Sequence, residues 1–170
     1  LVVCDPSNMA WLTGYDGWSF YVHQAVVVTH TAQPLWWGRS MDAQGALRTV
    51  YMDAQAILAY SDDYVMNPGH HAMGQLASEL LERGFGAARI GLELENYYFS
   101  AAAYLSLKSE LPDATLVDAT ALVNWQRTVK SETELDYMTR AARIVERMHT
   151  CIRERLEPGL RKNELVADIV

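Results

Sequence analysis

Apolar and polar residues follow two different periods along this chain, and together they predict a sheet flanked by helices. Short apolar or alternating runs, which are typical of strands, recur through the first two-thirds of the sequence. These predicted strands lie at residues 1–4, 19–29, 34–38, 56–60, 89–94 and 115–117. Longer segments with apolar residues three or four positions apart predict helices at residues 41–50, 72–83 and 100–110. Strands that alternate with helices of this length indicate the α/β class.

The connection between two early strands indicates that the sheet is mixed. Residues 19–29 and 34–38 are separated only by His30-Thr31-Ala32-Gln33, a link of hairpin length. A hairpin joins antiparallel strands, whereas the strand–helix–strand segments further along the chain favour parallel pairs. We therefore expect a mixed sheet with helices packed against it.

The last quarter of the chain has a purely helical pattern. Ser131 and Glu134 form a Ser-x-x-Glu capping box, which predicts a helix start. Apolar residues then follow one face of this helix until Pro158-Gly159. The final apolar residues, at positions 165, 166, 169 and 170, follow helical spacing and leave that face unfinished. We expect a first domain at residues 1–129, a linking helix and the start of a second domain at 130–170, and a longer whole protein.

The segment between residues 5 and 23 has an unusual composition for a connection. Pro6 and Ser7 predict the start of a short helical turn, and Gly14 supplies the left-handed position that ends it. Five aromatic or imidazole rings follow within nine residues, at Tyr15, Trp18, Phe20, Tyr21 and His23. Loops normally hold small polar residues, so these rings either cap the core or cover a ligand.

Composition and charge exclude several classes of function. Half of the 170 residues are apolar and the formal net charge is −7, so we expect a globular protein that does not bind nucleic acid. No apolar run approaches the 18 residues of a membrane span. The two cysteines, Cys4 and Cys151, have apolar neighbours, which indicates buried thiols in a reducing, cytoplasmic compartment.

No local motif supplies catalytic machinery. No two histidines have the spacing of a helical metal site, and the neighbours His70 and His71 should point apart. Glu93 and Glu95 share one face at the end of a predicted strand. They could act as paired carboxylates, or they could be a solvated pair at the sheet edge. The serines and cysteines lack the surroundings of an activated nucleophile.

Five segments resemble, in the expected order, the amino-terminal domain of the creatinase/prolidase/aminopeptidase P family. Asn8-Met9-Ala10-Trp11-Leu12-Thr13-Gly14 is similar to the family's Asn-x-x-Tyr-Leu-Thr-Gly, and Ile90-Gly91-Leu92-Glu93 is similar to its Ile-Gly-Val-Glu. The strand at 25–28, the junction at 122–130 and the helix start at 131–135 complete the resemblance. It covers nearly the whole chain and implies a creatinase-type, ribonuclease H-like α/β domain.

The resemblance also implies an activity and an assembly. Family members hydrolyse C–N bonds with two divalent metal ions, held by two Asp, one His and two Glu in a pita-bread domain that would follow this chain. This chain would then contribute no catalytic residue and no metal ligand. The amino-terminal domain would pack in a homodimer and lend side chains to the rim of the partner's active site, where a small-molecule substrate binds.

Such a rim needs two kinds of side chain: aromatic rings that cover a small solute, and polar groups that orient it. Five residues meet this description and are our candidates for substrate binding: Trp18, Tyr21, His23, Trp36 and Arg39. On a regular strand Tyr21 and His23 would share a face, and Trp18 would lie opposite unless the segment bends. For the two tryptophans, packing in the core or in a dimer interface is the alternative.

Three longer segments, at residues 7–24, 96–103 and 118–127, are more specifically similar to the branch of the family that opens the cyclic amidine ectoine. Ectoine is therefore the leading substrate. An Xaa-Pro dipeptidase or aminopeptidase is the alternative within the enzymes. A family member without metals, acting as a binding or dimerisation module, is the alternative outside them.

Overall fold

The computed structural model describes residues 1–19 and 21–169, so Phe20 and Val170 lie outside the described residues. The chain divides into two compact units, Leu1–Gln126 and Arg127–Val170. We call them the first and the second unit and describe each by itself.

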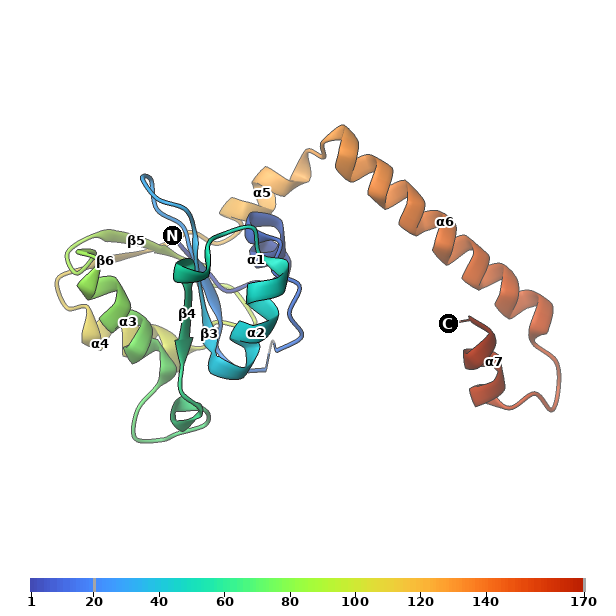
Figure 1. Cartoon of the computed structure of the whole chain (residues 1–170), viewed down its shortest axis with the longest axis horizontal. Coiled ribbons are helices and arrows are strands. Elements are labelled where there is room, and N and C mark those ends of the chain that lie inside the picture. Colours follow the sequence, from blue (N-terminus) through green and yellow to red (C-terminus); the bar gives the residue numbers. More distant parts are fainter. Residues whose placement is uncertain (20, 170) are drawn as a thin grey trace. The chain divides into compact units, whose positions relative to one another are not determined.

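The first unit contains a six-stranded mixed sheet (Figure 1). Its strands are β1 (Val2–Val3), β2 (Ala25–Val27), β3 (Leu35–Arg39), β4 (Ile57–Tyr60), β5 (Arg89–Leu92) and β6 (Thr115–Asp118). They lie in the order β4-β3-β2-β1-β5-β6. Strand β2 is antiparallel to both of its neighbours, and the remaining pairs are parallel. The prediction of a mixed sheet flanked by helices is confirmed.

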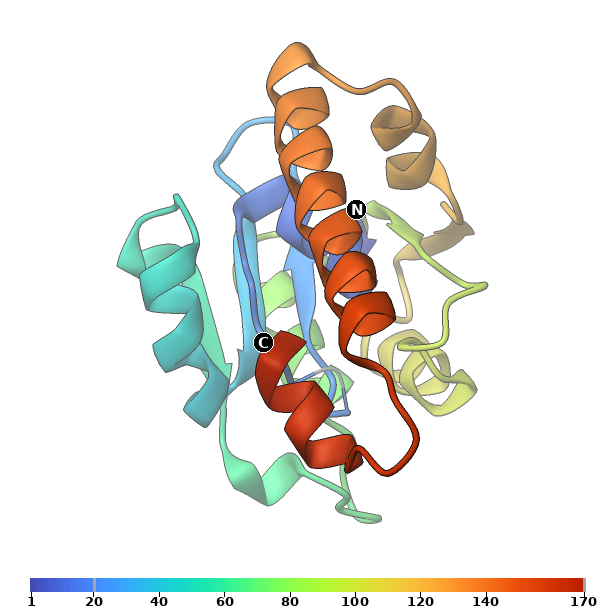
Figure 2. The same ribbon diagram turned by 90° about the vertical axis from the view of Figure 1, so that its right-hand side faces the viewer.

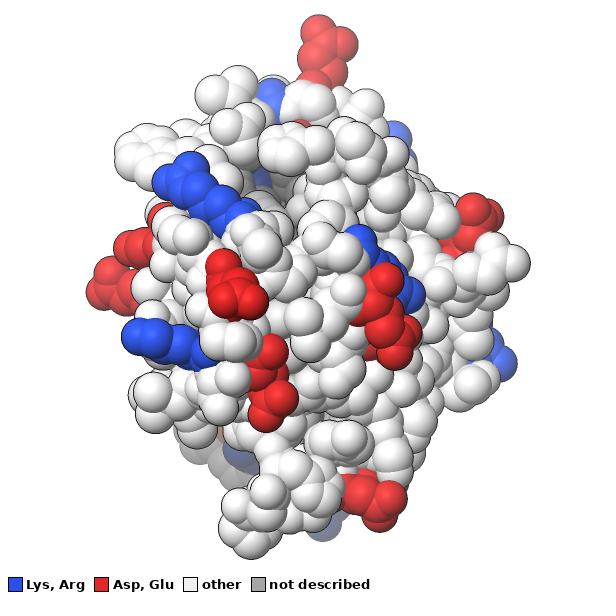
Figure 3. Space-filling model, turned by 90° about the vertical axis from the view of Figure 1, so that its left-hand side faces the viewer, with Lys and Arg blue, Asp and Glu red and all other residues white. Residues whose placement is uncertain are grey.

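Helices cover both faces of this sheet. The helices are α1 (Pro6–Thr13), α2 (Ser40–Thr49), α3 (Ala72–Glu82), α4 (Ala101–Glu110) and α5 (Leu122–Thr128), with short 3-10 turns at Ala54–Ala56 and Asp62–Tyr64. Figure 1 shows α3 and α4 on one side of the sheet and α1 and α2 on the other. On the α3–α4 side of the molecule, acidic and basic side chains are interspersed over the surface (Figure 3).

Two hydrophobic clusters form because successive strand residues point to opposite faces. Trp37 belongs to the cluster under α3 and α4, whereas its neighbour Trp36 belongs to the cluster under α1 and α2. Val2 and Val3 divide in the same way. Strands that are buried on both faces read as continuous apolar runs, which is why these segments could be recognised from the sequence.

Two local predictions are wrong. The strand predicted at residues 19–29 is confined to Ala25–Val27, and the chain turns before it, where the Val22 amide donates to the Ser19 carbonyl. The N-cap of α1 is Asp5 and not Ser7, since one carboxylate oxygen of Asp5 accepts the amides of Ser7 and Asn8 at 2.9 and 3.0 Å. Asp competes well for this position because its side chain reaches the free amides of the first turn.

The second unit consists of α6 (Glu132–Arg155) and α7 (Lys162–Ile169), and α7 turns back beside α6 (Figure 2). The predicted capping box is confirmed, because Ser131 Oγ accepts the Glu134 amide and Glu134 accepts the Ser131 amide at 2.7 Å. An ion pair between Arg155 and Asp168 joins the two helices. Among the described residues, no helix is both long and apolar enough to cross a membrane.

Candidate functional site

The topology of the first unit gathers many strand ends at one edge of the sheet. Strands β1, β3, β4, β5 and β6 end there, and the antiparallel strand β2 begins there. Ligands of α/β proteins commonly bind outside the carboxyl ends of the strands. Two polar clusters occupy this edge. We call them the histidine pocket, which lies beyond β4, and the Glu93 network, which lies beyond β1 and β5.

The histidine pocket has a volume of about 150 Å³. The bent segment before β2, the end of β4, the loop that follows it and the start of α3 all contribute to its lining. The lining residues are Tyr21, Val22, His23, Tyr60, Tyr64, Val65, Met66, Asn67, His71 and Ala72. The pocket is therefore built from two separate stretches of the sequence, 21–23 and 60–72, and the fold brings them together.

Two histidines face each other in this pocket. The ring centroids of His23 and His71 are 4.4 Å apart, and the ring planes are inclined by 49°. Burial, followed by the charge of His71, lowers the pKa of His23 to about 4. Burial also lowers the pKa of His71. Both imidazoles are therefore neutral at neutral pH, and they can meet without repulsion.

The hydrogen bond of His71 determines its tautomer. His71 is the N-cap of α3, and its Nδ1 accepts the Met73 amide at 3.1 Å. An Nδ1 atom that accepts a hydrogen bond carries no proton, so the proton of the neutral ring is on Nε2. The ring of His71 therefore offers an N–H donor.

Tyr60 holds the bent segment in place. Its hydroxyl donates to the His23 carbonyl at 2.6 Å, and its ring packs against Trp37 with centroids 4.8 Å apart. Burial raises the pKa of this hydroxyl, so it remains a donor at neutral pH. A core residue of β4 thus sets the position of His23.

Arg39 lies at the end of β3, beside Tyr60 in the register of β3 and β4. Its guanidinium makes a bidentate pair with Asp62, in which Nε to Oδ1 is 2.7 Å and Nη2 to Oδ2 is 2.9 Å. These hydrogen bonds raise the pKa of Arg39 and lower the pKa of Asp62. The Arg39 side chain is only 18% exposed, so Asp62 and the strand hold it in a defined direction.

The structure brings together some of the five residues selected from the sequence and separates others. Tyr21 and His23 line the same pocket, and Arg39 lies at the adjacent strand end. Trp18 is 82% exposed and is not among the residues that line the pocket. Trp36 is completely buried on the other face of the sheet, where its ring lies 5.1 Å from that of Tyr15. This burial corrects the selection of Trp36, because a side chain enclosed in the core has no surface for a substrate.

The sequence analysis did not select His71, Tyr60 or Tyr64 for this site. One signal for His71 was present, since it directly precedes the predicted helix at 72–83. His70 and His71 do meet different partners, as expected of neighbours: the ring of His70 packs against Tyr64 at 4.7 Å, and that of His71 against His23. Only the fold could show that a histidine from α3 meets one from the segment before β2.

The Glu93 network is a closed system of hydrogen bonds. Glu93 Oε2 accepts the amides of Cys4 and Asp5 at 2.7 and 2.9 Å and the side chain of Asn96 at 3.3 Å. Its Oε1 accepts Asn8 Nδ2 at 2.6 Å, and the same Nδ2 atom donates to Asn124 Oδ1 at 2.9 Å. Glu93 is only 3% exposed. Its oxygens are occupied by donors of the protein itself.

This network corrects the hypothesis of paired carboxylates. Glu93 is buried and fully bonded, whereas Glu95 is exposed. The two therefore differ in environment and do not form a solvated pair. The network also explains two of the family-like segments, because Asn8 of the first binds Glu93 of the second.

The cysteines and the possible metal ligands give no further site. Cys4 and Cys151 are both free thiols, the first buried and the second only half-buried. Burial raises the pKa of the Cys4 thiol, which keeps it unreactive. Within residues 1–19 and 21–169, no three His, Cys, Asp or Glu side chains are grouped so that they could hold a metal ion. The residues described do not fit a metal centre.

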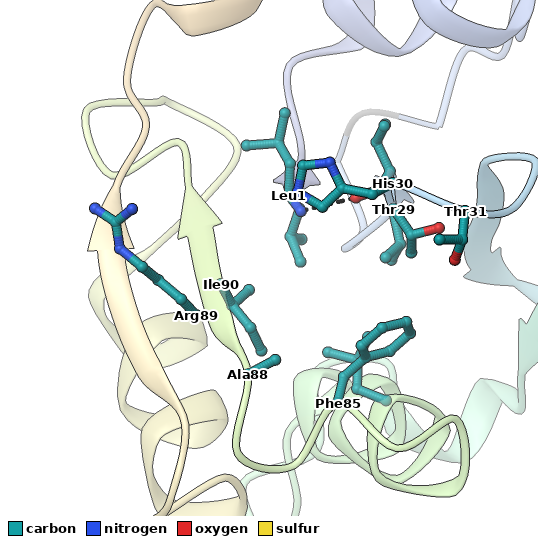
Figure 4. A pocket seen from close by; sticks show the side chains of 12 residues that line it. Leu1, Thr29, His30, Thr31, Phe85, Ala88, Arg89 and Ile90 are labelled. Atoms are coloured by element: carbon teal, nitrogen blue, oxygen red, sulfur yellow. Dashed lines mark hydrogen bonds between the residues drawn. The ribbon is translucent and has the colours of Figure 1, made fainter.

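A second pocket lies at the opposite edge of the sheet (Figure 4). It has a volume of about 290 Å³ and is lined mainly by apolar side chains, among them Leu1, Phe85 and Ile90. The Leu1 amino group donates to the Val28 carbonyl at 2.9 Å and continues the strand pairing there. None of the five selected residues lines this pocket.

The fold of this chain is shared with part of two solved peptidase structures. It superimposes on X-Pro aminopeptidase from Thermotoga maritima with a TM-score of 0.72 and 16% identity, over 99% of this chain and 44% of that one. The prolidase of Pyrococcus horikoshii gives a TM-score of 0.69 and 13% identity, over 99% of this chain and 42% of that one. At such identities these likenesses show the fold alone.

The sequence comparisons identify the family. Residues 1–129 match the model of the creatinase/prolidase N-terminal domain, and the chain belongs to this family. It is 55% identical to an ectoine hydrolase of Halomonas elongata and 41% identical to the uncharacterized hydrolase/peptidase y4tM of Sinorhizobium fredii. Each match covers 99% of this chain and 43% of the relative. The chain thus spans less than half the length of these relatives.

Proposed function

We propose that this chain is the amino-terminal part of a metal-dependent hydrolase that cleaves a C–N bond of ectoine and opens its ring. The 55% identity to an ectoine hydrolase, which extends over 170 residues, carries this proposal. The family membership and the fold support the coarser statement that the chain is a domain of a hydrolase.

Within that enzyme, we assign the first unit to dimerisation and to the rim of the partner subunit's active site. Tyr21, His23 and Arg39 are the residues that would meet the substrate. The exposed ring of Tyr21 can cover a small cyclic solute, and neutral His23 can exchange a hydrogen bond with it. Arg39 carries a permanent positive charge, which favours the carboxylate that ectoine bears beside its amidine. Their positions at one edge of the sheet support this assignment.

The two divalent metal ions implied by the family resemblance would belong to the part of the enzyme that follows this chain. The described residues offer no ligand set for them, so we assign this chain binding and orientation of the substrate only. Residues 130–170 would form the linking helix and the start of that second domain. We place the enzyme in the cytoplasm.

The test is ring opening of ectoine by the purified full-length protein, with Ala-Pro as the parallel substrate. We expect turnover of ectoine that is lost with a chelator and restored by a divalent metal, and no turnover of Ala-Pro. Turnover of Ala-Pro alone would replace ectoine by an Xaa-Pro peptide. If neither compound reacts, the chain belongs to a binding module.

The rim assignment has its own test in the same assay. Tyr21→Ala removes a ring that is 64% exposed beside the histidine pocket, and Tyr51→Ala removes a ring of similar exposure, 69%, which does not line that pocket. We expect a KM for ectoine raised about 5-fold to 10-fold for the first variant, because loss of one stacking or hydrogen-bonding contact costs roughly 1 kcal/mol. We expect an unchanged KM for the second. Equal KM values for both variants would remove Tyr21 from the rim.

A further inference from the structure

We propose that His71 is a further ligand-binding residue, and that its Nε2–H donates a hydrogen bond to the carboxylate of a small molecule in the histidine pocket. Insofar as that molecule is ectoine, the inference rests on the proposed function. The sequence analysis did not select His71, and its role follows from four observations in the structure.

The first observation is that the Nε2 atom of His71 stays protonated and acts only as a hydrogen-bond donor. The Nδ1 atom of His71 accepts the Met73 amide at 3.1 Å and caps α3. Moving the ring proton to Nδ1 would break this hydrogen bond and leave an amide of the first helical turn without its cap. The proton therefore remains on Nε2, and no described residue accepts it.

The second observation is that no acidic side chain is among the described residues that line the pocket. The described residues that line the pocket include tyrosine, histidine and asparagine side chains but no Asp or Glu. The nearest acids along the chain are already engaged: Asp62 pairs with Arg39, and Asp63 accepts the Ser61 hydroxyl at 3.0 Å. A carboxylate that enters the pocket therefore meets hydrogen-bond donors in the lining and no acidic side chain among the described lining residues.

The third observation is that the ring is held in place. His71 lies against His23 with centroids 4.4 Å apart, and the Tyr60 hydroxyl binds the His23 backbone at 2.6 Å. One side of the His71 ring thus packs against a residue that is itself fixed from β4. A donor fixed before binding loses little entropy when the ligand arrives.

The fourth observation is the position of the pocket at the start of an 11-residue helix. The unpaired amides at a helix N-terminus carry a partial positive charge, which favours an anion nearby. This field adds to the Nε2–H donor. The volume of about 150 Å³ is enough for a carboxylate and the adjoining part of a small ring, with the remainder outside.

The substitution that separates binding from folding is His71→Asn in the full-length enzyme. Asn is among the best N-cap residues, so the Met73 amide keeps an acceptor while the ring and its Nε2–H are lost. We expect a KM for ectoine raised about 10-fold or more, since a hydrogen bond to a charged group contributes roughly 1.5–3 kcal/mol. We expect kcat within about twofold and an unchanged melting temperature, as the cap is retained.

His30→Asn is the matched control, because it makes the same chemical change at a side chain at the opposite edge of the sheet that does not line the histidine pocket. Its KM should equal that of the unsubstituted enzyme. If His71→Asn also leaves KM unchanged, the inference is overturned. His71→Gln, which can again present an N–H donor, should recover part of the lost affinity.

A measurement on the unsubstituted protein keeps the inference testable even if His71→Asn is poorly folded. In the full-length protein with ¹⁵N-labelled histidine, His71 should show the Nε2–H tautomer, and its Nε2 signal should shift as ectoine is added. A parallel titration with Ala-Pro, which also carries a carboxylate, separates the two proposals. A shift with Ala-Pro alone would discard ectoine and keep His71, whereas no shift with either compound would overturn the role of His71.

Discussion

The two polar clusters at the carboxyl edge of the sheet differ in how far their polar groups are hydrogen-bonded within the protein. In the Glu93 network, the buried carboxylate is bound by two backbone amides and two asparagine side chains. In the histidine pocket, both histidines are only half-buried, and His71 retains an N–H donor for which no acceptor is seen among the described residues.

This difference distinguishes polar groups that stabilise the fold from polar groups that are available to bind a ligand. Buried polar groups that satisfy one another stabilise the fold. A cluster whose side chains are fixed by core residues, but which keeps a hydrogen-bond donor accessible at the surface, is suited to binding a ligand. The Glu93 network therefore joins β1, β5, α1 and α5, and the histidine pocket is the site that we propose for a substrate.

The largest expected effect is that of Glu93→Ala on stability. Removal of this carboxylate takes away the acceptor of the Cys4 and Asp5 amides in a buried place, and it takes away one of the two acceptors of Asn8 Nδ2. We expect a loss of about 3 kcal/mol or more in the free energy of unfolding, because each buried donor left without an acceptor costs roughly 1–3 kcal/mol. Urea unfolding of the full-length protein, followed by tryptophan fluorescence, measures it.

Glu95→Ala is the control for this experiment, because Glu95 is exposed and lies two residues away. Its unfolding free energy should change by no more than about 0.5 kcal/mol. If the two variants unfold at the same urea concentration, the Glu93 network does not stabilise the fold, and the contrast between the clusters fails.

A smaller effect is expected from pH. The pKa of His23 in the folded protein is about 4, below the ordinary value of 6.5. The unfolded chain therefore binds the proton first as the pH falls, and stability decreases from about pH 6.5 towards pH 4. Allowing for the partial exposure of the ring, we expect His23 to contribute about 1–2 kcal/mol to this decrease.

His23→Gln tests the origin of this pH dependence, because glutamine does not titrate. The unfolding free energy of the full-length variant should fall less steeply between pH 6.5 and pH 4 than that of the unsubstituted protein. Identical slopes would mean that His23 is not held neutral by its place in the pocket.

The smallest effect is expected from Asp62→Asn. The bidentate pair with Arg39 is well formed, but the Asp62 side chain is 60% exposed. Solvent-exposed ion pairs contribute little to stability, so the melting temperature should fall only slightly. Asp63→Asn is the neighbouring control. A destabilisation as large as that of Glu93→Ala would show that this edge of the sheet is more tightly coupled than its exposure indicates.

Much of the fold could be predicted because its signals are local. The apolar runs of β1, β3, β4 and β5, the helical spacing of α3, and the capping box at Ser131 each depend on residues close in sequence. The strand at 19–29 was overestimated because aromatic residues favour strands wherever they occur. Whether such residues pair depends on neighbouring strands, and β2 pairs only over Ala25–Val27.

The site was predicted less completely. Tyr21, His23 and Arg39 were selected for their chemistry, and the fold places them at one edge. Trp36 was selected for the same reason, yet the alternation of a doubly buried strand turns its ring into the core. The neighbouring Trp37 is equally buried on the other face, so the sequence alone offers no sign that separates a core tryptophan from one at a rim.

The sequence by itself determined the α/β class, the mixed sheet, the positions of the helices and the family, because periodicity and short motifs are written along the chain. Only the tertiary structure decided which polar residues meet. Glu93 is brought to Asn8 across 85 positions, and His71 is brought to His23 from a different element. Such pairings depend on strand order and on the packing of helices against the sheet, and these are properties of the whole fold that no local segment carries.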